Sequence, residues 1–377
     1  MHQRVITMSS SIHKLPRYFT YEHFEKVFME VIEKLPQDFY SFSYLGSSVE
    51  NRSVFGLRLG HGDLKVLAWS QMHGNESTTT RAIVGLLENK EFFQLLDNIS
   101  LYIIPVLNPD GANEWTRNNA NNVDLNRDAQ ELSQPESLIL KDAIDFFKPD
   151  LALNLHGQRT IYGVENSVLP CQLSFLTPSA DPDKRITPSR LQSMKLINHI
   201  IADLKDLSKA AVGRYDDAFN INCWGDYCQS QDIPTILFEA GHAGEDYSRD
   251  HVVELIKESL MSVLKNVPMM KNIENENESV LEVYQSIPAV QKNYVDILLR
   301  NAPSINGARD IAIMYHEQVA SGGLEFIPMI YAIDEDCILY GHRTIDLAKE
   351  ENFQDDLVIE DDMVVTSQSL KISSFIK

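Results

Sequence analysis

The sequence predicts an α/β fold, in which a mixed, mostly parallel β-sheet is flanked by helices and followed by a small β-rich C-terminal domain. Up to about residue 266, short apolar runs alternate with longer segments whose apolar residues recur every three or four positions. The short runs are typical of buried strands, and the longer segments of amphipathic helices. Such alternation favours a helix-covered sheet that carries functional residues at the carboxyl ends of its strands.

Length and composition limit the class of protein. At 377 residues, of which 44% are hydrophobic, the chain is long enough to bury a large core, and we expect one sizeable domain plus a smaller one. Its net charge of -21 would repel nucleic acid and anionic lipid surfaces. We therefore expect neither nucleic acid nor a membrane as a partner.

The sequence shows no targeting or membrane-spanning segment. Residues Met1–Met8 lack the apolar stretch of about 7 to 15 residues that a signal peptide needs. No run approaches the roughly 18 apolar residues of a spanning helix, so we expect a soluble, cytoplasmic protein. Its four cysteines do not indicate a disulfide framework in a chain of this length, and we expect buried or free thiols.

Residues 1–270 are expected to form the larger domain. Helical spacing predicts helices over 21–35, 78–88, 135–147, 189–207 and 248–266. Short apolar runs predict strands over 39–45, 53–59, 64–70, 100–107, 151–155 and 234–238. The segments between them are predicted to be a turn at 108–111, a polar loop over 112–128, a proline-rich surface loop over 159–188 and a pocket-forming loop over 212–232.

The remainder of the chain is expected to form a second domain. Residues 271–279 are acidic and of low complexity, which is typical of a linker. Residues 280–377 are expected to form a small β-rich accessory domain. Within it we predict a helix over 289–299 and strands over 311–315, 325–333 and 337–340.

A possible metal site begins at a strand-to-helix turn. His73 and Glu76 follow the predicted strand 64–70 and precede the predicted helix 78–88. An imidazole and a carboxylate three residues apart can point at one position, and zinc accepts both nitrogen and oxygen ligands. A catalytic zinc needs a third protein ligand, and a lone His-x-x-Glu pair is more often two surface residues.

Other strand ends supply the missing groups. His156 follows the predicted strand 151–155, and Glu239 follows the strand 234–238, where a carboxylate is costly unless it is used. The polar loop 112–128 follows a further strand. Because the carboxyl ends of parallel strands meet at one edge of a sheet, these groups are expected to converge with His73 and Glu76.

Taken in order, these motifs resemble those of one enzyme family. The set comprises His73-x-x-Glu76, Asn108-Pro109-Asp110-Gly111, Arg117, Asp124-Leu125-Asn126-Arg127, His156 and Phe238-Glu239. It resembles the ordered motifs of the zinc carboxypeptidases related to carboxypeptidase A, over about residues 64–240. The resemblance implies a zinc metallocarboxypeptidase that hydrolyses the C-terminal amide bond of peptides, with one Zn²⁺ per chain.

The same resemblance implies a role for each residue of the catalytic centre. The zinc ligands would be His73, Glu76 and His156, and Glu239 would be the general base. Zinc lowers the pKa of a bound water, and Glu239 could take its proton and return it to the leaving amine. Arg117 would polarise the scissile carbonyl.

The resemblance also implies how the substrate is held. Asn126 and Arg127 would bind its terminal carboxylate, because a planar guanidinium pairs bidentately with a carboxylate. The alternative for Arg127 is a structural ion pair with Asp124 or Asp128. We assign the tyrosine that closes over the substrate to Tyr215, with Tyr227 as an alternative.

The choice of substrate side chain stays open at this point. Residues that set it are expected between Tyr215 and Gln229. The acidic residues there would favour a basic side chain, and the aromatic residues an apolar one; they are Asp216, Asp217, Asp226, Phe219 and Trp224.

Three other functions compete with the carboxypeptidase. One is a zinc amidohydrolase of N-acyl amino acids, of the aspartoacylase and succinylglutamate desuccinylase type, which uses a similar ligand set. The others are a murein-peptide amidase and a binding module whose zinc is structural or lost. The Asn-Pro-Asp-Gly motif and the separate Arg117 favour the peptidase, and Glu239 argues against a binding module.

Overall fold

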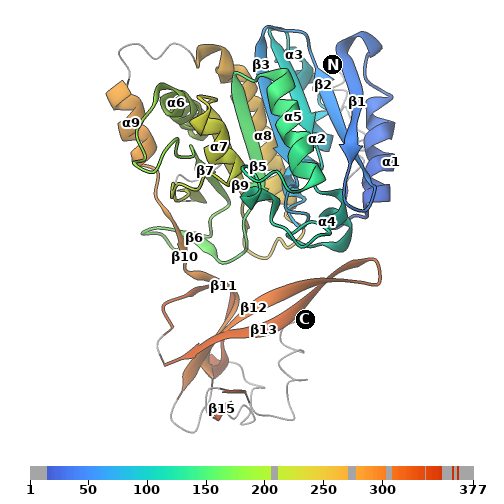
Figure 1. Cartoon of the computed structure of the whole chain (residues 1–377). Helices are drawn as coiled ribbons and strands as arrows, with labels where there is room; N and C mark the ends of the chain where they lie inside the picture. Colours follow the sequence, from blue (N-terminus) through green and yellow to red (C-terminus); the bar gives the residue numbers. More distant parts are fainter. Residues whose placement is uncertain are drawn as a thin grey trace, which may run out of the picture.

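The computed structural model describes residues 15–204, 211–270, 277–302, 308–335 and 337–349, together with the strand pair β15 (Ile359–Glu360) and β16 (Met363–Val364). Residues 1–8, on which the absence of a signal peptide was argued, and residues 271–276 of the predicted linker lie outside the described residues. Figure 1 shows a larger body, in which helices cover a sheet, and a smaller β-rich body below it.

A mixed, eight-stranded sheet forms the centre of the larger body (Figure 1). In spatial order its strands are β1 (Tyr40–Ser47), β2 (Ser53–Leu59), β4 (Ile99–Ile104), β3 (Leu64–Ser70), β5 (Leu151–Gly157), β9 (Thr235–Ala240), β7 (Leu173–Leu176) and β8 (Val212–Arg214). The four central strands β4, β3, β5 and β9 are parallel to one another, whereas β2 and β7 are antiparallel to their central neighbours. The predicted mixed, mostly parallel sheet is confirmed.

Helices cover both faces of this sheet. The face that holds the larger hydrophobic cluster is covered by α1 (Tyr21–Ile32), α2 (Thr78–Leu86), α3 (Lys90–Gln94), α6 (Pro188–Asp203) and α8 (Asp250–Asn266). The other face is covered by α5 (Pro135–Phe147) and α7 (Trp224–Ser230). Because the central strands are buried on both sides, most of their residues are apolar on either face instead of alternating with polar ones, and every residue of β4 is buried.

The structure also bears on two expectations about the whole chain. No helix among the described residues is long and apolar enough to cross a membrane. The cysteines are unpaired, and three of them are buried, namely Cys171, Cys228 and Cys337. This agrees with the expectation of buried or free thiols.

Two predicted loops contain regular structure. The segment 159–188, predicted to be irregular, contains β6 (Tyr162–Val164) and β7, and β7 pairs with β9 in the main sheet. The predicted turn at 108–111 opens the helix α4 (Pro109–Glu114). Asn108 caps this helix, since its Oδ1 accepts a hydrogen bond from the Gly111 amide at 2.8 Å, and Pro109 occupies the first turn.

The smaller body is a four-stranded sheet in the order β13 (Gly323–Asp334), β12 (Arg309–Ala320), β11 (Tyr294–Ala302) and β14 (Tyr340–Asp346). The predicted helix over 289–299 is wrong, because this segment forms β10 (Val290–Lys292) and most of β11. β11 lies inside the sheet and is largely buried. Apolar residues therefore occupy both faces of β11, with the buried Asp296 among them, and periodicity alone cannot distinguish such a segment from a buried helix.

The segment between the two sheets packs on the larger body. Val280, Tyr284 and Ile287, in and just after helix α9 (Asn277–Gln285), join the larger hydrophobic cluster. Strand β10 pairs antiparallel with β6. We propose that the accessory domain proper begins at β11, near residue 294, instead of at residue 280.

The packing of α1 predicts the effect of one core substitution. Phe28 is fully buried and stacks on Phe24 with ring centroids 5.1 Å apart. Phe28→Ala is therefore expected to lower the free energy of unfolding by about 3–5 kcal/mol, measured by chemical denaturation. Phe146 on α5 is 82% exposed, so Phe146→Ala is expected to stay within about 0.5 kcal/mol of the original protein. Equal losses in the two variants would contradict this packing.

Candidate active site

The turn after β3 has a backbone that its neighbours enforce. Gln71 adopts a left-handed conformation with φ of 51°, and its side chain donates to the Gly74 carbonyl at 2.7 Å. Gly74 lies so close to Gly111 of α4 that an added Cβ would be 1.9 Å from the Gly111 carbonyl carbon. Only glycine fits at this position. The turn therefore delivers His73 and Glu76 at the carboxyl end of β3 in a fixed geometry.

His73, Glu76 and His156 converge on one point. The Nδ1 atom of His73 lies 2.8 Å from Glu76 Oε1, and the Nδ1 atom of His156 lies 3.0 Å from Glu76 Oε2. The two Nδ1 atoms are 3.1 Å apart, and one ligand atom from each of the three residues lies within 4.8 Å of the others. Two imidazole nitrogens and a carboxylate oxygen, nearly excluded from solvent, fit the donor set of a catalytic zinc.

Further contacts orient these three side chains. His73 Nε2 lies 3.0 Å from Asp124 Oδ1, and a proton on Nε2 shared with this carboxylate leaves the Nδ1 lone pair free for a metal. The Gly157 amide donates to Glu76 Oε2 at 2.9 Å. Asp124 belongs to the Asp-Leu-Asn-Arg motif, but the sequence did not reveal this contact, because 51 positions separate Asp124 from His73.

The charges of His73, Glu76 and Asp124 shift one another's pKa values. Burial lowers the pKa of His73, but the carboxylates of Glu76 and Asp124 outweigh it and raise that pKa to about 9. Burial raises the pKa values of Glu76 and Asp124, but hydrogen bonds and attraction from His73 hold both well below their ordinary values. Burial lowers the pKa of His156. Both carboxylates are therefore ionised at neutral pH.

Glu239 lies on the next strand, at the same level as His156. The two residues are register partners in the parallel pair of β5 and β9. Glu239 Oε2 has no hydrogen-bond partner among the described residues. Burial, and then the negative charge of Glu76, raise the pKa of Glu239 to about 8. A carboxyl group that titrates near neutral pH beside a metal site suits proton transfer.

The structure places Arg117 beside the group formed by His73, Glu76 and His156. Its Nη2 and Nε atoms donate to Asp124 Oδ2 at 3.0 and 3.2 Å, and its Nη1 lies 3.5 Å from Glu76 Oε1. The Arg117 side chain is 47% exposed. Its guanidinium is therefore anchored at the edge of the site and still open to a substrate.

Asn126 and Arg127 lie in a 3-10 turn, Leu125–Arg127, on the same rim. The Nδ2 atom of Asn126 lies 3.5 Å from His156 Nε2, while its Oδ1 accepts from the Trp224 amide at 3.0 Å. Arg127 is exposed and donates to the Asn126 carbonyl and to Cys223 Sγ. It forms no ion pair with any described residue, so the alternative of an ion pair with Asp124 or Asp128 receives no support.

Tyr215, the tyrosine predicted to close over the substrate, lies near the carboxyl groups of Glu239 and Glu76. The Tyr215 hydroxyl is 2.8 Å from the hydroxyl of Tyr162, a residue that the sequence did not indicate. Burial, and then the charge of Glu239, raise the pKa of Tyr215 well above its ordinary value. Tyr215 therefore stays protonated and is able to donate a hydrogen bond.

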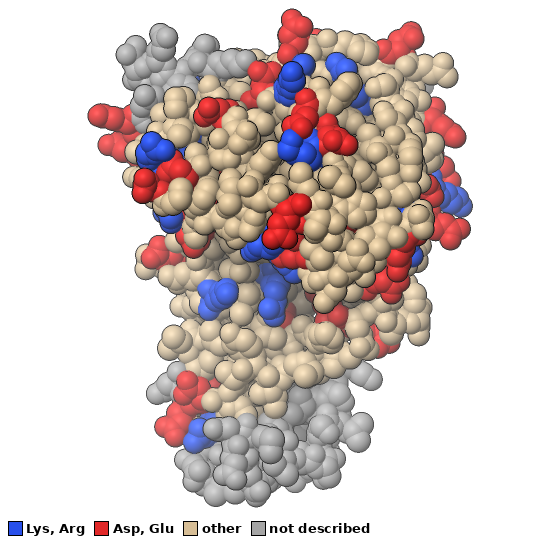
Figure 2. Space-filling view, viewed as in Figure 1, with Lys and Arg blue, Asp and Glu red and all other residues tan. Residues whose placement is uncertain are grey.

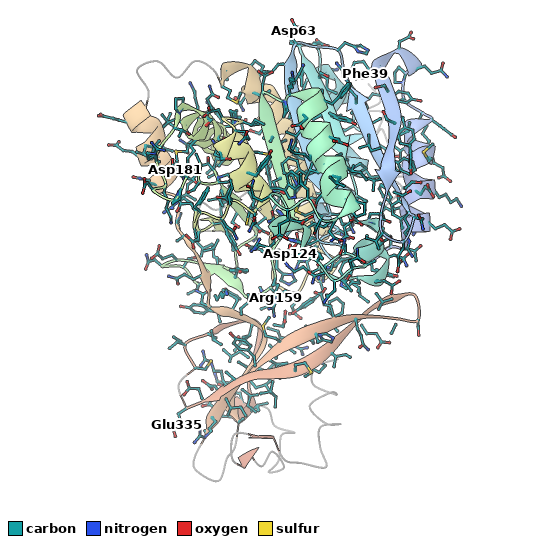
Figure 3. All side chains as sticks on the ribbon, viewed as in Figure 1. Phe39, Asp63, Asp124, Arg159, Asp181 and Glu335 are labelled. Atoms are coloured by element: carbon teal, nitrogen blue, oxygen red, sulfur yellow. The ribbon has the colours of Figure 1, made fainter. Side chains whose placement is uncertain are left out.

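Charged side chains of both signs lie around the site. Figure 3 labels Asp124 and Arg159 at the end of the larger body that faces the smaller one. Figure 2 shows basic side chains, with acidic ones nearby, on the surface where the two bodies meet. An exposed arginine such as Arg127 would attract a negatively charged group of a substrate.

Comparison with known proteins finds one matching family model. Residues 26–144, about a third of the chain, match the model described as zinc carboxypeptidase. Over this segment the chain is similar to the zinc carboxypeptidase family. The matched residues include the turn that carries His73 and Glu76, called here the proposed metal-binding turn, and the Asp-Leu-Asn-Arg motif. His156 and Glu239 lie beyond them.

Similar proteins match the chain over short segments. A probable carboxypeptidase 2 from Arthroderma benhamiae is 32% identical over 130 residues, which cover 33% of this chain and 23% of the relative. Carboxypeptidase D from Homo sapiens is 25% identical over 177 residues, which cover 38% of this chain and 13% of the relative. The chain thus spans less than a quarter of either protein.

Solved structures of other proteins share its fold. A metallo-carboxypeptidase from Burkholderia cenocepacia superposes with a TM-score of 0.52 at 20% identity, over 67% of this chain and 70% of that one. Bovine thrombin-activatable fibrinolysis inhibitor, in complex with tick carboxypeptidase inhibitor, gives a TM-score of 0.54 at 15% identity, over 68% and 98% of the two chains. The predicted carboxypeptidase-like fold is therefore confirmed.

The unpaired carboxyl group of Glu239 predicts a pH effect in metal-free protein. Because its pKa is raised from 4.5 to about 8, its protonated form contributes stability below about pH 4.5 that is lost as pH rises through about 8. Glu239→Gln removes this titration. The variant is expected to gain about 1–3 kcal/mol over metal-free original protein between pH 5 and pH 9, measured by denaturation.

A matched control uses Glu258 of α8, which is exposed. Glu258→Gln is expected to leave the pH dependence of stability unchanged. A Glu239→Gln variant whose stability follows that of the original protein at every pH would show that Glu239 titrates normally.

Proposed function

We propose that this protein is a zinc-dependent metallocarboxypeptidase, which hydrolyses the C-terminal amide bond of peptides and carries one Zn²⁺ per chain. The observation that carries the proposal is the convergence of His73, Glu76 and His156 beside the unpaired carboxyl group of Glu239. The match of residues 26–144 to the zinc carboxypeptidase model supports it. Since the matched relatives are several times longer than the shared segment, activity and substrate belong to the proposal. We further expect the protein to act in the cytoplasm.

Each side chain has a distinct part in the proposed reaction. A zinc ion held by His73, Glu76 and His156 would supply a water of lowered pKa and polarise a carbonyl oxygen. Glu239 accepts a proton and returns it to the leaving amine, which its raised pKa favours. Arg117, anchored by Asp124, stabilises negative charge on the scissile carbonyl oxygen.

Substrate binding rests on the exposed rim of the site. Arg127 presents a guanidinium that no described carboxylate occupies, and with Asn126 it would bind the terminal carboxylate of the peptide. Tyr215 would donate a hydrogen bond from its protonated hydroxyl to the bound substrate. Binding of the free chain end is what distinguishes a carboxypeptidase from an endopeptidase.

Removal of single groups tests the catalytic assignment. His73→Ala and His156→Ala are expected to lose zinc, measured by metal analysis, from a starting value near one ion per chain. Glu239→Gln is expected to retain zinc while its kcat falls by at least about a thousandfold, because no other described residue is placed to move the proton. Full activity in Glu239→Gln would refute the mechanism.

The substrates used in this assay also separate the competing functions. A library of blocked dipeptides with free C-terminal residues tests the carboxypeptidase. N-acyl aspartate and a γ-D-glutamyl-diaminopimelate peptide test the amidohydrolase and the murein-peptide amidase. Turnover of only one of the last two would replace the proposed reaction.

Substitution of Arg127 tests how the substrate end is recognised. Arg127→Lys keeps the charge but loses the bidentate geometry, and its KM for peptides with a free carboxylate is expected to rise about 10- to 100-fold. Lys148→Arg, far along the chain in the turn that ends α5, serves as a control for the exchange of basic residues. An unchanged KM in Arg127→Lys would place the carboxylate-binding group elsewhere.

A further inference from the structure

The accessory domain inserts one carboxylate into the larger body. Glu317 of β12 contacts two buried residues of the larger body, Arg17 and Trp115. Its Oε1 lies 2.6 Å from Arg17 Nη2, and its Oε2 accepts from Trp115 Nε1 at 3.1 Å. The Glu317 side chain is itself only 22% exposed. Both oxygens are thus engaged across the boundary between the two bodies.

The contact with Trp115 leads directly to the candidate active site. Trp115 ends α4 in a left-handed conformation with φ of 57°, so its ring orientation and the path of the next residues are linked. The carbonyl of Thr116 accepts from the Asn75 amide at 3.1 Å, and Asn75 lies between His73 and Glu76. Arg117 follows immediately. A shift of Trp115 would therefore move both the metal-binding turn and the arginine beside it.

The contact with Arg17 reaches the other side of the same turn. The Arg17 carbonyl accepts a hydrogen bond from Ser77 Oγ, and Ser77 follows Glu76. Arg17 Nη1 also donates to the Tyr247 carbonyl at 3.0 Å. The residues before and after Glu76 are thus each connected to Glu317 through one intermediate side chain.

Charge balance gives Glu317 a second effect. Arg249 is buried, and its Nη1 donates to the carbonyl of Ala240, which follows Glu239. Burial and the nearby charge of Arg17 lower the pKa of Arg249 to about 10, while the carboxylate of Glu317 acts in the opposite direction. Without this carboxylate, two buried guanidiniums close to the site would repel each other with less compensation.

We propose that Glu317 is a positioning residue, through which the accessory domain fixes the metal-binding turn and Arg117 from both sides by way of Arg17 and Trp115. This inference rests on the proposed function. It assigns the accessory domain a part in the active site, although none of its described residues forms a hydrogen bond or ion pair with His73, Glu76 or His156. The accessory domain acts by holding residues of the larger body in place for the reaction.

Two substitutions in the full-length, zinc-loaded protein test the proposal. Glu317→Gln removes the charge but keeps the shape, and Trp115→Phe keeps an aromatic ring but removes the indole N–H together with part of the ring system. Each is expected to lower kcat about tenfold, with KM within about twofold and zinc content unchanged, because the loss concerns groups that act in the transition state. Glu325→Gln, the same change at an exposed position of β13, is the control and is expected to retain the original kcat.

Amide hydrogen exchange supplies a readout that does not depend on activity. In Glu317→Gln and in Trp115→Phe, the amides of Asn75 and Glu76 are expected to exchange at least about tenfold faster, while those of the central strand β5 stay unchanged. If Glu317→Gln fails to fold, Trp115→Phe still decides the matter.

Three outcomes would overturn the proposal. One is unchanged kcat and unchanged exchange in both variants. Another is a lower melting temperature with normal kcat, since that would show Glu317 to be purely structural. The third is faster exchange that is equally large in Glu325→Gln. If the original protein hydrolyses no peptide, the proposed function fails, whereas the exchange experiment still tests the link from Glu317 to the metal-binding turn.

Discussion

The carboxylate of Glu76 is the group on which the arrangement of the site depends. One oxygen contacts His73, and the other contacts His156 and the amide of Gly157. Its negative charge raises the pKa of His73 and also that of Glu239 on the neighbouring strand. A single buried charge thus joins two strands of the sheet and separates the roles of two carboxyl groups, one ionised and one able to carry a proton.

Much of the fold could be predicted because the central strands are buried on both sides. The strand 64–70 and the helix 135–147 have the same bounds in the structure, and both bury continuous or periodic apolar residues. Predictions failed where a strand and a helix would bury similar apolar residues. The segment 289–299 is predicted from its sequence to be a helix, whereas residues 294–302 form β11 because they lie between β12 and β14.

The site could be anticipated in part for a related reason. His73, Glu76, His156 and Glu239 follow apolar runs, so the sequence alone indicates that they lie at strand ends. The contacts that orient them join residues far apart in the chain: Asp124 to His73, Tyr162 to Tyr215, and Glu317 to Trp115. Sequence spacing carries no information about such pairs. They depend on how the sheet closes and on where the second domain lies.

The short strand β10 has a consequence for how the protein can be divided. Its pairing partner β6 carries Tyr162, and the Pro288 carbonyl just before β10 accepts from the Arg214 amide, next to Tyr215. The crossing between the two domains therefore packs against the segments that carry Tyr162 and Tyr215. A truncation placed in the acidic segment would remove these contacts, so a shortened form that lacks activity would reveal nothing about Glu239 or the three proposed metal ligands.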